Sequence, residues 1–463
     1  MQDLTTGSIT RHLLKTTSFM LVMMVFQTLY FLIDLYWVGR LGTEAVAGVA
    51  IAGNLSFVVL AVGQVLGVGT TTVVSHAVGR RDQPEARHLF NQSMVLSCVA
   101  GAAFLVAGLA LLGPYTRAMG ADPATAAVAA AYLRWFVPAM ALQFPLGAMG
   151  AALRATGNFR PTMIVSTASV VLNMILAPFL IFGWGTGRAF GVAGAAISSL
   201  VAIVVGLAWM ATYFRPADAF LHFARAEWRP DVAQWRRMLA IGLPAGFEFA
   251  MMALYQVVVY TVARPFGAAA QAGFGIGMRV IQAGFMPVVA LGFAVAPVAG
   301  QNFGARMADR VRATFKDAAL LATVVMALFA LLSHVAPEAM VRAFTGDDAV
   351  VAVGADYLRI ISWNYVASGL IFVAGSTFQA MGNTIPSLVA SAVRMSLVIG
   401  PALLLSRLPG FRLTWVWYLA MATVYVQLAL SLWLLRREFA RKLTPGAATP
   451  AVGPAAAVEV AGG

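Results

Sequence analysis

Long apolar stretches alternate with short polar segments along the whole chain. Each stretch has about 20 residues, the length of an α-helix that crosses a lipid bilayer. Runs such as 316–336 are apolar on all sides, which excludes the alternating strands of a transmembrane β-barrel. The pattern predicts an all-α integral membrane protein with twelve transmembrane helices. They lie near residues 14–38, 48–73, 91–113, 128–150, 161–183, 190–213, 238–263, 273–298, 316–336, 353–376, 385–406 and 413–435.

The chain repeats itself: residues 29–161 recur as residues 254–386 at a constant offset of 225 positions, without a gap. Glycines, arginines and a proline occur at equivalent positions in the two copies. The matches include Leu29-Tyr30 with Leu254-Tyr255, Gly42 with Gly267, Gly79 with Gly304, Arg87 with Arg312, Asp122 with Asp347, Tyr132 with Tyr357, Gly157 with Gly382 and Pro161 with Pro386. Six spans per copy is an even number, so both copies enter the membrane from the same side. This predicts two six-helix lobes related by a pseudo-two-fold axis along the membrane normal.

The repeat and the polar segments divide the chain into four predicted regions. Residues 1–213 form a first six-helix lobe, and residues 238–440 form a second one. Between them, residues 214–237 are rich in Arg, Asp, Pro and Trp and form a cytoplasmic linker. Residues 441–463 are low in complexity, and we expect a disordered tail there.

The charge distribution orients the protein in the membrane. Hydrophobic residues make up 60% of the chain and charged residues 11%, whereas soluble domains carry roughly 25% charged residues. The net charge of +13 arises from arginines and lysines that gather on the side of the N-terminus, which is the positive-inside pattern. It predicts a multi-pass protein of the cytoplasmic (inner) membrane with both termini in the cytoplasm. We expect lipid around the protein, no nucleic-acid partner and a monomer.

Several kinds of chemistry are excluded by what the sequence lacks. It has no phosphate-binding loop and no metalloprotease helix motif. Its five histidines do not cluster, and Cys98 is its single cysteine, so no disulfide framework or cysteine metal cluster can form. We therefore expect no enzymatic activity, no cofactor and no metal site.

Asp34 is the strongest candidate for a functional residue, because ionisable groups within membrane spans are costly and usually serve function. It lies near the outer end of the first span. Tyr30 precedes it by one helical turn and Gln27 by two, so the three share one helix face. The counterpart in the second repeat is Val259, so duplication does not explain the acid. The alternative is an aspartate that caps or packs a helix end.

Asn173 in the fifth span, and Ser198 and Ser199 in the sixth, are further polar candidates. Pro178 follows Asn173 and is able to bend that helix. Each residue alone is typical of a hydrogen bond between helices. Together with Asp34 they would form one polar cluster inside the first lobe.

Three more residues are candidates for binding a substrate: Glu248, Gln143 and Arg394. Glu248 follows Pro244 in the seventh span, and it either binds a substrate or cation or pairs locally with an arginine. Arg279 and Arg394 lie within spans without an obvious partner, and we expect them to face a cavity.

Five sequence blocks resemble the multidrug and toxic compound extrusion (MATE) family over about residues 8–440. They are Asp34–Gly42 (DLYWVGRLG), Gly67–Gly69 with Ser75–Asp82 (SHAVGRRD), Ala152–Asn158 (ALRATGN), Ala296–Ala305 (APVAGQNFGA) and Gln379–Thr384 (QAMGNT). The resemblance implies a V-shaped pair of six-helix lobes around a central cavity. It also implies export of cationic, amphipathic compounds in exchange for H⁺ or Na⁺.

Within that family the first lobe resembles the DinF branch, in which a first-helix aspartate preceded by Tyr and Gln lines the coupling site. Asp34, Tyr30 and Gln27 match that spacing, and Asn173 matches the branch's fifth-helix asparagine. The branch has a second carboxylate four residues later, where this chain has Ala177.

These observations lead to a hypothesis of antiport by alternating access, in which Asp34 couples efflux to cation entry, helped by Asn173, Tyr30, Gln27 and Ser199. An apolar surrounding favours the neutral form of a carboxyl group, so protonation from outside would let the first lobe repack and release a drug. One carboxylate suffices for H⁺, whereas Na⁺ needs more oxygens, so H⁺ is favoured. The alternatives are a lipid-linked oligosaccharide flippase of the same superfamily and a non-transporting membrane scaffold.

Overall fold

The computed structural model describes residues 2–120, 122–185, 187–216 and 219–443, and within them the protein is built from helices. Twelve of these helical segments are long and apolar enough to cross a membrane. This confirms the predicted all-α architecture. The predicted tail, residues 441–463, lies outside the described residues from residue 444 onward.

Helices α1 to α7 form what we call the first lobe. Their bounds are α1 (Ile9–Gly39), α2 (Thr43–Gly79), α3 (Gln83–Ala110), the short α4 (Leu112–Met119), α5 (Pro123–Ala155), α6 (Phe159–Phe182) and α7 (Val192–Thr212). A short 3-10 helix, η1 (Arg225–Glu227), follows in the linker.

Helices α8 to α15 form the second lobe. Their bounds are α8 (Val232–Ala263), η2 (Arg264–Phe266), α9 (Ala268–Gly304), α10 (Ala308–Val335), α11 (Pro337–Arg342), α12 (Asp348–Ile361), η3 (Ser362–Asn364), α13 (Tyr365–Ala380), α14 (Ile385–Leu405) and α15 (Leu413–Lys442). Each predicted span coincides with one helix, except that the tenth is divided into α12, η3 and α13. Most helices extend beyond the apolar stretch, because the helix continues into the polar residues at its ends.

Aspartates begin several of the helices. The side chain of Asp82 accepts a hydrogen bond from the amide of Glu85, and Asp122 accepts one from the amide of Thr125. Such caps satisfy backbone donors that have no partner within the helix. Asp347, the repeat equivalent of Asp122, caps α12 in the same way. The sequence repeat is thus also a repeat of local hydrogen bonding.

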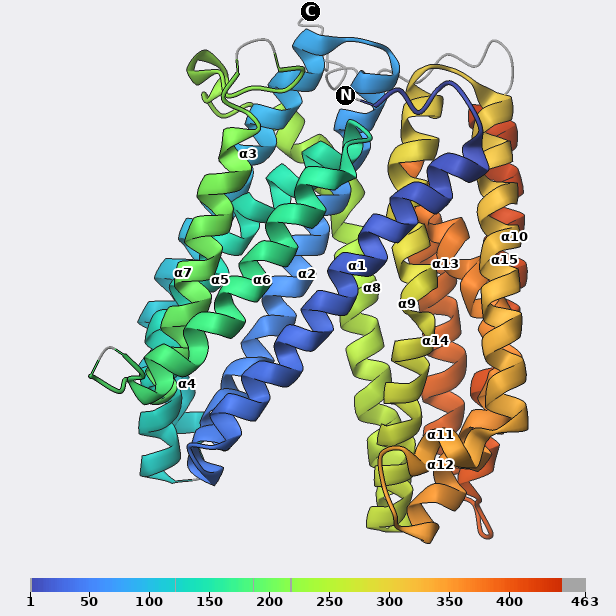
Figure 1. Ribbon diagram of the computed structural model, residues 1–463. Coiled ribbons are helices and arrows are strands. Elements are labelled where there is room, and N and C mark those ends of the chain that lie inside the picture. Colours follow the sequence, from blue (N-terminus) through green and yellow to red (C-terminus); the bar gives the residue numbers. More distant parts are fainter. Residues whose placement is uncertain (1, 121, 186, 217–218, 444–463) are drawn as a thin grey trace, which may run out of the picture.

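The two lobes form a V (Figure 1): they meet at the end that carries the start of α1 and diverge toward the other end. We call the end where they meet the closed end. The start of α1 and the end of α15 both lie there, and both contact the first turns of α10. Thr10 of α1 donates a 2.6 Å hydrogen bond to Asp317, and Arg312 donates one to the carbonyl of Leu443, which follows α15. Both described ends of the chain therefore lie on the same side, as an even number of spans requires.

The pseudo-two-fold axis passes between α2 and α9, whose backbones touch at the closed end. A Cβ atom added to Gly79 would lie 2.0 Å from the carbonyl oxygen of Gln301. One added to Gly304 would lie 2.2 Å from the carbonyl oxygen of His76. Gly79 and Gly304 are repeat equivalents, and so are His76 and Gln301. The two contacts are therefore one contact seen from each lobe, which confirms the predicted symmetry.

Two hydrogen bonds between the lobes obey the same symmetry. The His76 ring donates to the carbonyl of Ala380 at 2.6 Å, and the Gln301 amide donates to the carbonyl of Ala155 at 2.7 Å. Ala155 and Ala380 are again 225 positions apart. Because all four residues are buried, these bonds are protected from competition by water.

The N-terminal segment, residues 2–8, also joins the lobes at the closed end. Leu4 is fully buried, and its amide donates to the Gln301 side chain at 3.0 Å. Its carbonyl accepts hydrogen bonds from Asn302 at 3.2 Å and from Arg310 at 3.3 Å. All three partners belong to the second lobe.

The same segment contacts the first lobe. The amide of Gln2 donates to the carbonyl of Thr156 at 3.0 Å, and Asp3 forms a 3.3 Å ion pair with Arg81. A hydrogen bond from the Thr5 hydroxyl lowers the pKa of Asp3, and Arg81 acts in the same direction. Asp3 is therefore charged at neutral pH, and the ion pair is lost only in acid, as the pH falls through this lowered pKa.

The linker is fixed to the first lobe by two buried amides of α3. Asn91 accepts a 3.0 Å hydrogen bond from the indole of Trp228, and Gln92 accepts one of the same length from the indole of Trp235. The Gln92 amide also donates to the carbonyl of Glu227 at 2.7 Å. The polar linker is thus an ordered part of the closed end in the residues that the structure describes.

The close contact between α2 and α9 leads to a prediction about the stability of a Gly79 variant. Gly79→Ala should destabilise the protein by about 1–3 kcal/mol, because the new methyl group overlaps a backbone oxygen of the other lobe. Gly67→Ala is the matched control on α2, since a Cβ atom there meets nothing within 4 Å. That variant should be neutral or slightly more stable. Thermal unfolding of both purified variants measures the difference, and equal stability would show that the lobes do not touch at Gly79.

Candidate functional site

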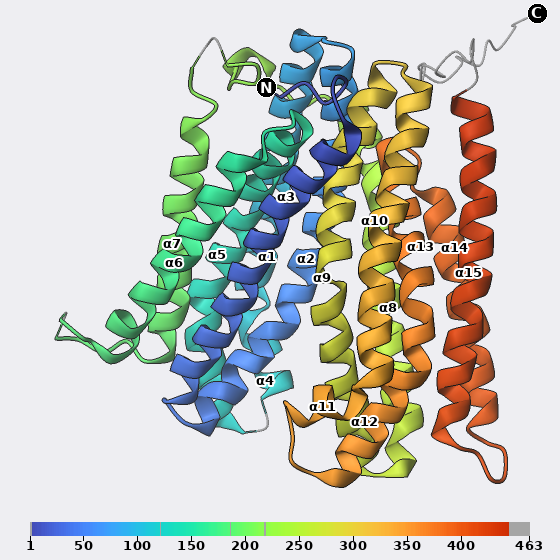
Figure 2. The same ribbon diagram turned by 45° about the vertical axis from the view of Figure 1, so that its right-hand side comes forward.

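Helix α1 connects the two lobes and carries the candidate acid. It packs on α9 and α10 of the second lobe and on α6, α2 and α7 of the first lobe. Figures 1 and 2 show it running obliquely from the second lobe at the closed end to the first lobe at the other end. Asp34 belongs to the half inside the first lobe.

One carboxylate oxygen of Asp34 has no hydrogen-bond partner, although it is buried. The side chain interacts electrostatically with the hydroxyl groups of Tyr30 and Tyr132. No cation pairs with it among the described residues. An uncompensated buried carboxylate is costly, so this site is suited to taking up a positive charge.

Tyr30, Asn173 and Ser199 form a hydrogen-bonded chain next to Asp34. The Tyr30 and Ser199 hydroxyls are 3.0 Å apart, and the Asn173 amide donates to Ser199 at 2.9 Å. The Ser199 hydroxyl also donates to the carbonyl of Ala195 at 3.1 Å. Because a hydroxyl has one proton to give, Ser199 must accept from Tyr30. The Tyr30 proton is thus committed to Ser199, which leaves the free oxygen of Asp34 without a donor.

The surroundings of this first-lobe cluster are apolar. Asn173 is 3% exposed, and Ala177, one turn later, is 1% exposed within a core that includes Ile181, Ala195 and Ala196. Ser198 adds one more hydroxyl, 3.5 Å from the Asn173 amide. Among the described residues, no group of three or more His, Cys, Asp or Glu side chains is arranged to hold a metal ion. The cluster therefore contains one carboxylate with neutral polar neighbours.

Two of the candidate residues lie apart from the first-lobe cluster. Gln27 shares the helix face of Tyr30 and Asp34, yet its side chain is exposed. Helix α1 leaves the first lobe toward its N-terminus, so the face that contacts α7 at Tyr30 is uncovered at Gln27. Gln143 on α5 is also exposed.

Tyr132 was not among the sequence candidates, although it interacts with Asp34 and is 2% exposed. The only feature of the sequence that singles out Tyr132 is its recurrence as Tyr357 in the second repeat. Recurrence alone is typical of a structural residue, so it did not indicate proximity to the acid.

Glu248 has no arginine partner in the part of the chain that the structure describes. It lies on α8, and its side chain interacts electrostatically with the hydroxyl group of Ser387 on α14. No ion pair of Glu248 is present among the described residues. The contact crosses the interface of α8 and α14 inside the second lobe.

Arg394 lies two turns farther along that interface. Its guanidinium group is 3.4 Å from the side-chain oxygen of Gln427 and lies 5.7 Å from the centre of the Tyr255 ring. Gln427 in turn donates to Ser391 at 3.1 Å. The Nε atom of Arg394 is buried and lacks a partner. Arg279 on α9 is exposed instead.

A pocket of about 470 Å³ lies between the lobes. Phe57 of α2 lines it from the first lobe, and Gln256, Tyr260, Arg264 and Gln271 are among its residues from the second lobe. Its position agrees with the central cavity expected of two diverging lobes. Its lining includes two aromatic rings, Phe57 and Tyr260, and two amides, Gln256 and Gln271.

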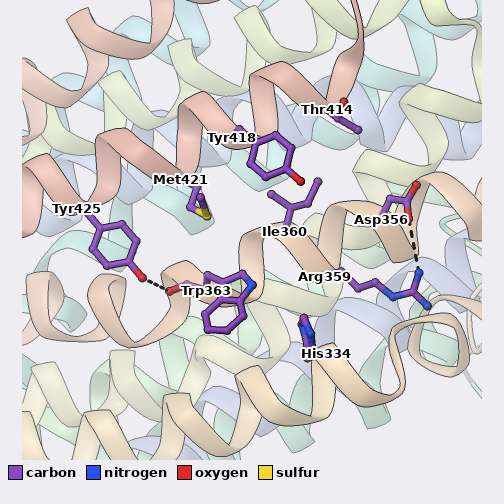
Figure 3. A pocket seen from close by; sticks show the side chains of 9 residues that line it. All are labelled: His334, Asp356, Arg359, Ile360, Trp363, Thr414, Tyr418, Met421 and Tyr425. Carbon is purple, nitrogen blue, oxygen red and sulfur yellow. Dashed lines mark hydrogen bonds and ion pairs between the residues drawn. The ribbon is translucent and has the colours of Figure 1, made fainter.

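A second pocket, of about 640 Å³, belongs to the second lobe alone (Figure 3). It lies between α10, α12, η3 and α15, and the Tyr425 hydroxyl donates to the carbonyl of Trp363 across it at 2.7 Å. Arg359 is 3.6 Å from Asp356 at its other side. None of its lining residues comes from the first lobe, so it is separate from the Asp34 cluster.

Comparison with known proteins agrees with this geometry. The model of the MatE family matches residues 20–179 and 244–404, which is one match for each repeat. A probable multidrug resistance protein, YoeA of Bacillus subtilis, is 24% identical over 85% of this chain and 86% of its own length. The FAD transporter of Shewanella oneidensis is 24% identical over 80% of this chain and 82% of its own. The multidrug export protein MepA of Staphylococcus aureus is 25% identical over 90% and 92%.

Solved structures share the fold over almost the whole chain. One is described as the outward-facing conformation of a multidrug resistance MATE family transporter of the MOP superfamily. It superposes with a TM-score of 0.87 at 22% identity and covers 96% of this chain and 98% of that one. Another, a MATE protein in a bent conformation, has a TM-score of 0.88 at 22% identity, with 94% and 97% coverage. The chain belongs to the MatE family of multi-pass membrane transporters, which are not enzymes.

Proposed function

We propose that this protein is a secondary antiporter that exports cationic and amphipathic drug-like compounds in exchange for H⁺, by alternating access. The observation that carries the proposal is the buried, unpartnered carboxylate oxygen of Asp34. A coupling ion drives a conformational change only if it binds the two states of the protein with different affinity, and the carboxylate of Asp34 is suited to binding a proton in this way. The names of YoeA and MepA support the choice of substrate class.

The position of Asp34 on α1 suggests how its charge would reach both lobes. As an anion, Asp34 favours a conformation in which water or a cation compensates the charge. As a neutral acid, it no longer needs that compensation, and the apolar core around Ala177 can close over it. Helix α1 packs on α6 in one lobe and on α9 in the other, so a small movement of α1 would change the contact between them.

H⁺ is favoured over Na⁺ as the coupling ion. A sodium ion needs several oxygen ligands at one point. The Tyr30 and Ser199 hydroxyls are already hydrogen-bonded to each other, and the position of a second acid is occupied by the apolar Ala177. The Asp34, Tyr30 and Asn173 pattern supports a relationship with the DinF branch of the family.

The orientation follows from the arginines at the closed end. Arg81 and Arg310 bind the N-terminal segment there, and Arg312 binds the end of α15. By the positive-inside rule, we assign the closed end and both termini to the cytoplasm, in the inner membrane. The lobes then diverge toward the outside, so a drug in the pocket between them would be ready for release.

We further propose that residues 1–213 and 238–440 move as two units connected by the linker 214–237. The linker is hydrogen-bonded to α3 of the first lobe through Asn91 and Gln92. This would keep it with that lobe, so that the relative movement is taken up near the start of α8.

Asp34→Asn should abolish gradient-driven export while leaving the protein folded, because the amide keeps the shape of the side chain but cannot exchange a proton. Rhodamine 6G transport in proteoliposomes with an imposed pH gradient is the measurement. Glu44→Gln is the matched control, since Glu44 is an exposed acid at the start of α2 in the same lobe. Export by Asp34→Asn at the wild-type rate would refute the coupling role of Asp34.

Separate ion gradients should identify the coupling ion. An inward proton gradient without a sodium gradient should drive rhodamine 6G export by the wild-type protein, because one carboxylate can carry one proton. A sodium gradient at equal pH on both sides should leave transport at the level of empty liposomes. Transport driven by sodium alone would show that the oxygens around Asp34 form a cation site after all.

A further inference from the structure

Arg394 is a cation without a carboxylate partner. It lies in the middle of α14, and its Nε atom is covered and unbonded. Its neighbours are neutral: the Gln427 oxygen at 3.4 Å, and the Tyr255 and Tyr357 side chains. Of the acids that the structure describes, none forms an ion pair with it. Its charge is therefore compensated only by dipoles and by an aromatic ring.

Such an arginine is costly within a membrane-spanning lobe. A structural arginine usually directs its forked donors to a carboxylate. Here the hydrogen bond to Gln427 is long, and Gln427 has a second partner in Ser391. The protein thus retains a positive charge in a place where its own side chains do not neutralise it, and a ligand with a negative charge would do so.

The two lobes have opposite charges at corresponding sites. In the first lobe, Asp34 lies beside Tyr30 and Tyr132. In the second lobe, the equivalent residues Tyr255 and Tyr357 lie beside Arg394. The position equivalent to Asp34 is the fully buried Val259. The pair of tyrosines is therefore present in both repeats, whereas the charged residue near it is an aspartate in the first lobe and an arginine in the second.

We propose that the second lobe binds an anionic group, a carboxylate or a phosphate, at the guanidinium group of Arg394. The anion comes either from a transported organic molecule or from a free inorganic ion. In the first case the substrates include amphipathic compounds with an acidic group in addition to cations, which extends and rests on the proposed transport function.

Access to this site is compatible with the fold. Arg394 keeps intermediate exposure as a residue, so the site is not sealed. Gln256, which follows Tyr255 on α8, lines the pocket between the lobes. Glu248 lies on the same interface of α8 and α14, but two turns away, where its side chain interacts electrostatically with Ser387. The Glu248 carboxylate therefore does not neutralise the guanidinium group of Arg394.

The test uses purified full-length protein and 6-carboxyfluorescein, a xanthene dye with carboxylate groups. Fluorescence anisotropy should show saturable binding to the wild type. Arg394→Gln should bind the dye about 10- to 100-fold more weakly, which is the effect of losing one charge-assisted interaction. Arg394→Lys keeps the charge and should retain measurable binding. Arg407→Gln removes an exposed arginine of the same lobe and should bind like the wild type.

Inorganic anions separate the two possible sources. If a free ion is the ligand, chloride or phosphate should raise the melting temperature of the wild type by several degrees, but not that of Arg394→Gln. If an organic acid is the ligand, only the dye should bind. Should Arg394→Gln fold poorly, Arg394→Lys replaces it in the test: loss of the forked donors should weaken dye binding measurably relative to the wild type, and equal affinity would overturn the site.

Absence of binding of both the dye and the inorganic anions to the wild type would overturn the inference, as would equal dye affinity of Arg394→Gln. Rhodamine 6G export tests the transport function independently. A wild type that exports rhodamine 6G but binds no anion refutes the anion site alone. Anion binding that depends on Arg394, in a protein that exports nothing, refutes the proposed antiport alone.

Discussion

The close crossing of α2 and α9 is the contact on which the arrangement of the molecule depends. At Gly79 and Gly304 the backbone of each lobe touches a carbonyl group of the other, and no side chain larger than hydrogen fits. Helices in lipid are not driven together by the hydrophobic effect, so close van der Waals contact and hydrogen bonds must hold them. Here the glycines allow the close contact, and His76 and Gln301 donate the hydrogen bonds between the lobes.

This contact is confined to one end, and that is why the molecule is a V. Toward the other end the lobes diverge. Between the two ends α8 also packs closely on α2, where a Cβ atom added to Gly242 would lie 2.0 Å from the carbonyl oxygen of Val65, and α1 packs on both lobes. Asp34 thus lies on a helix that contacts both lobes. The N-terminal segment adds further hydrogen bonds at the closed end through Leu4, and these must break if the lobes are to separate there.

Symmetry and asymmetry have different roles in this protein. The equivalent pairs Gly79 and Gly304, and Asp122 and Asp347, maintain the fold in both repeats. Asp34 and Arg394 lack a counterpart of the same charge in the other repeat, and they are the residues on which the proposed functions of the two lobes rest. The difference between the copies was visible for Asp34, because an acid in an apolar helix is conspicuous. For Arg394 the difference between the repeats was less informative, because the sequence does not show whether the folded protein places an acid next to this arginine.

The sequence by itself determined the twelve spans, the repeat with its pseudo-two-fold axis and the polar residues of the first lobe, because span length, a constant offset and rare charges are local properties of the chain. The tertiary structure decided that Tyr30, Ser199 and Asn173 form one chain and that Gln27 and Gln143 are exposed. It also decided that Glu248 faces Ser387 rather than an arginine. In a membrane protein the faces toward lipid and toward other helices are both apolar. The pattern therefore cannot tell them apart, and only the packing of distant helices does.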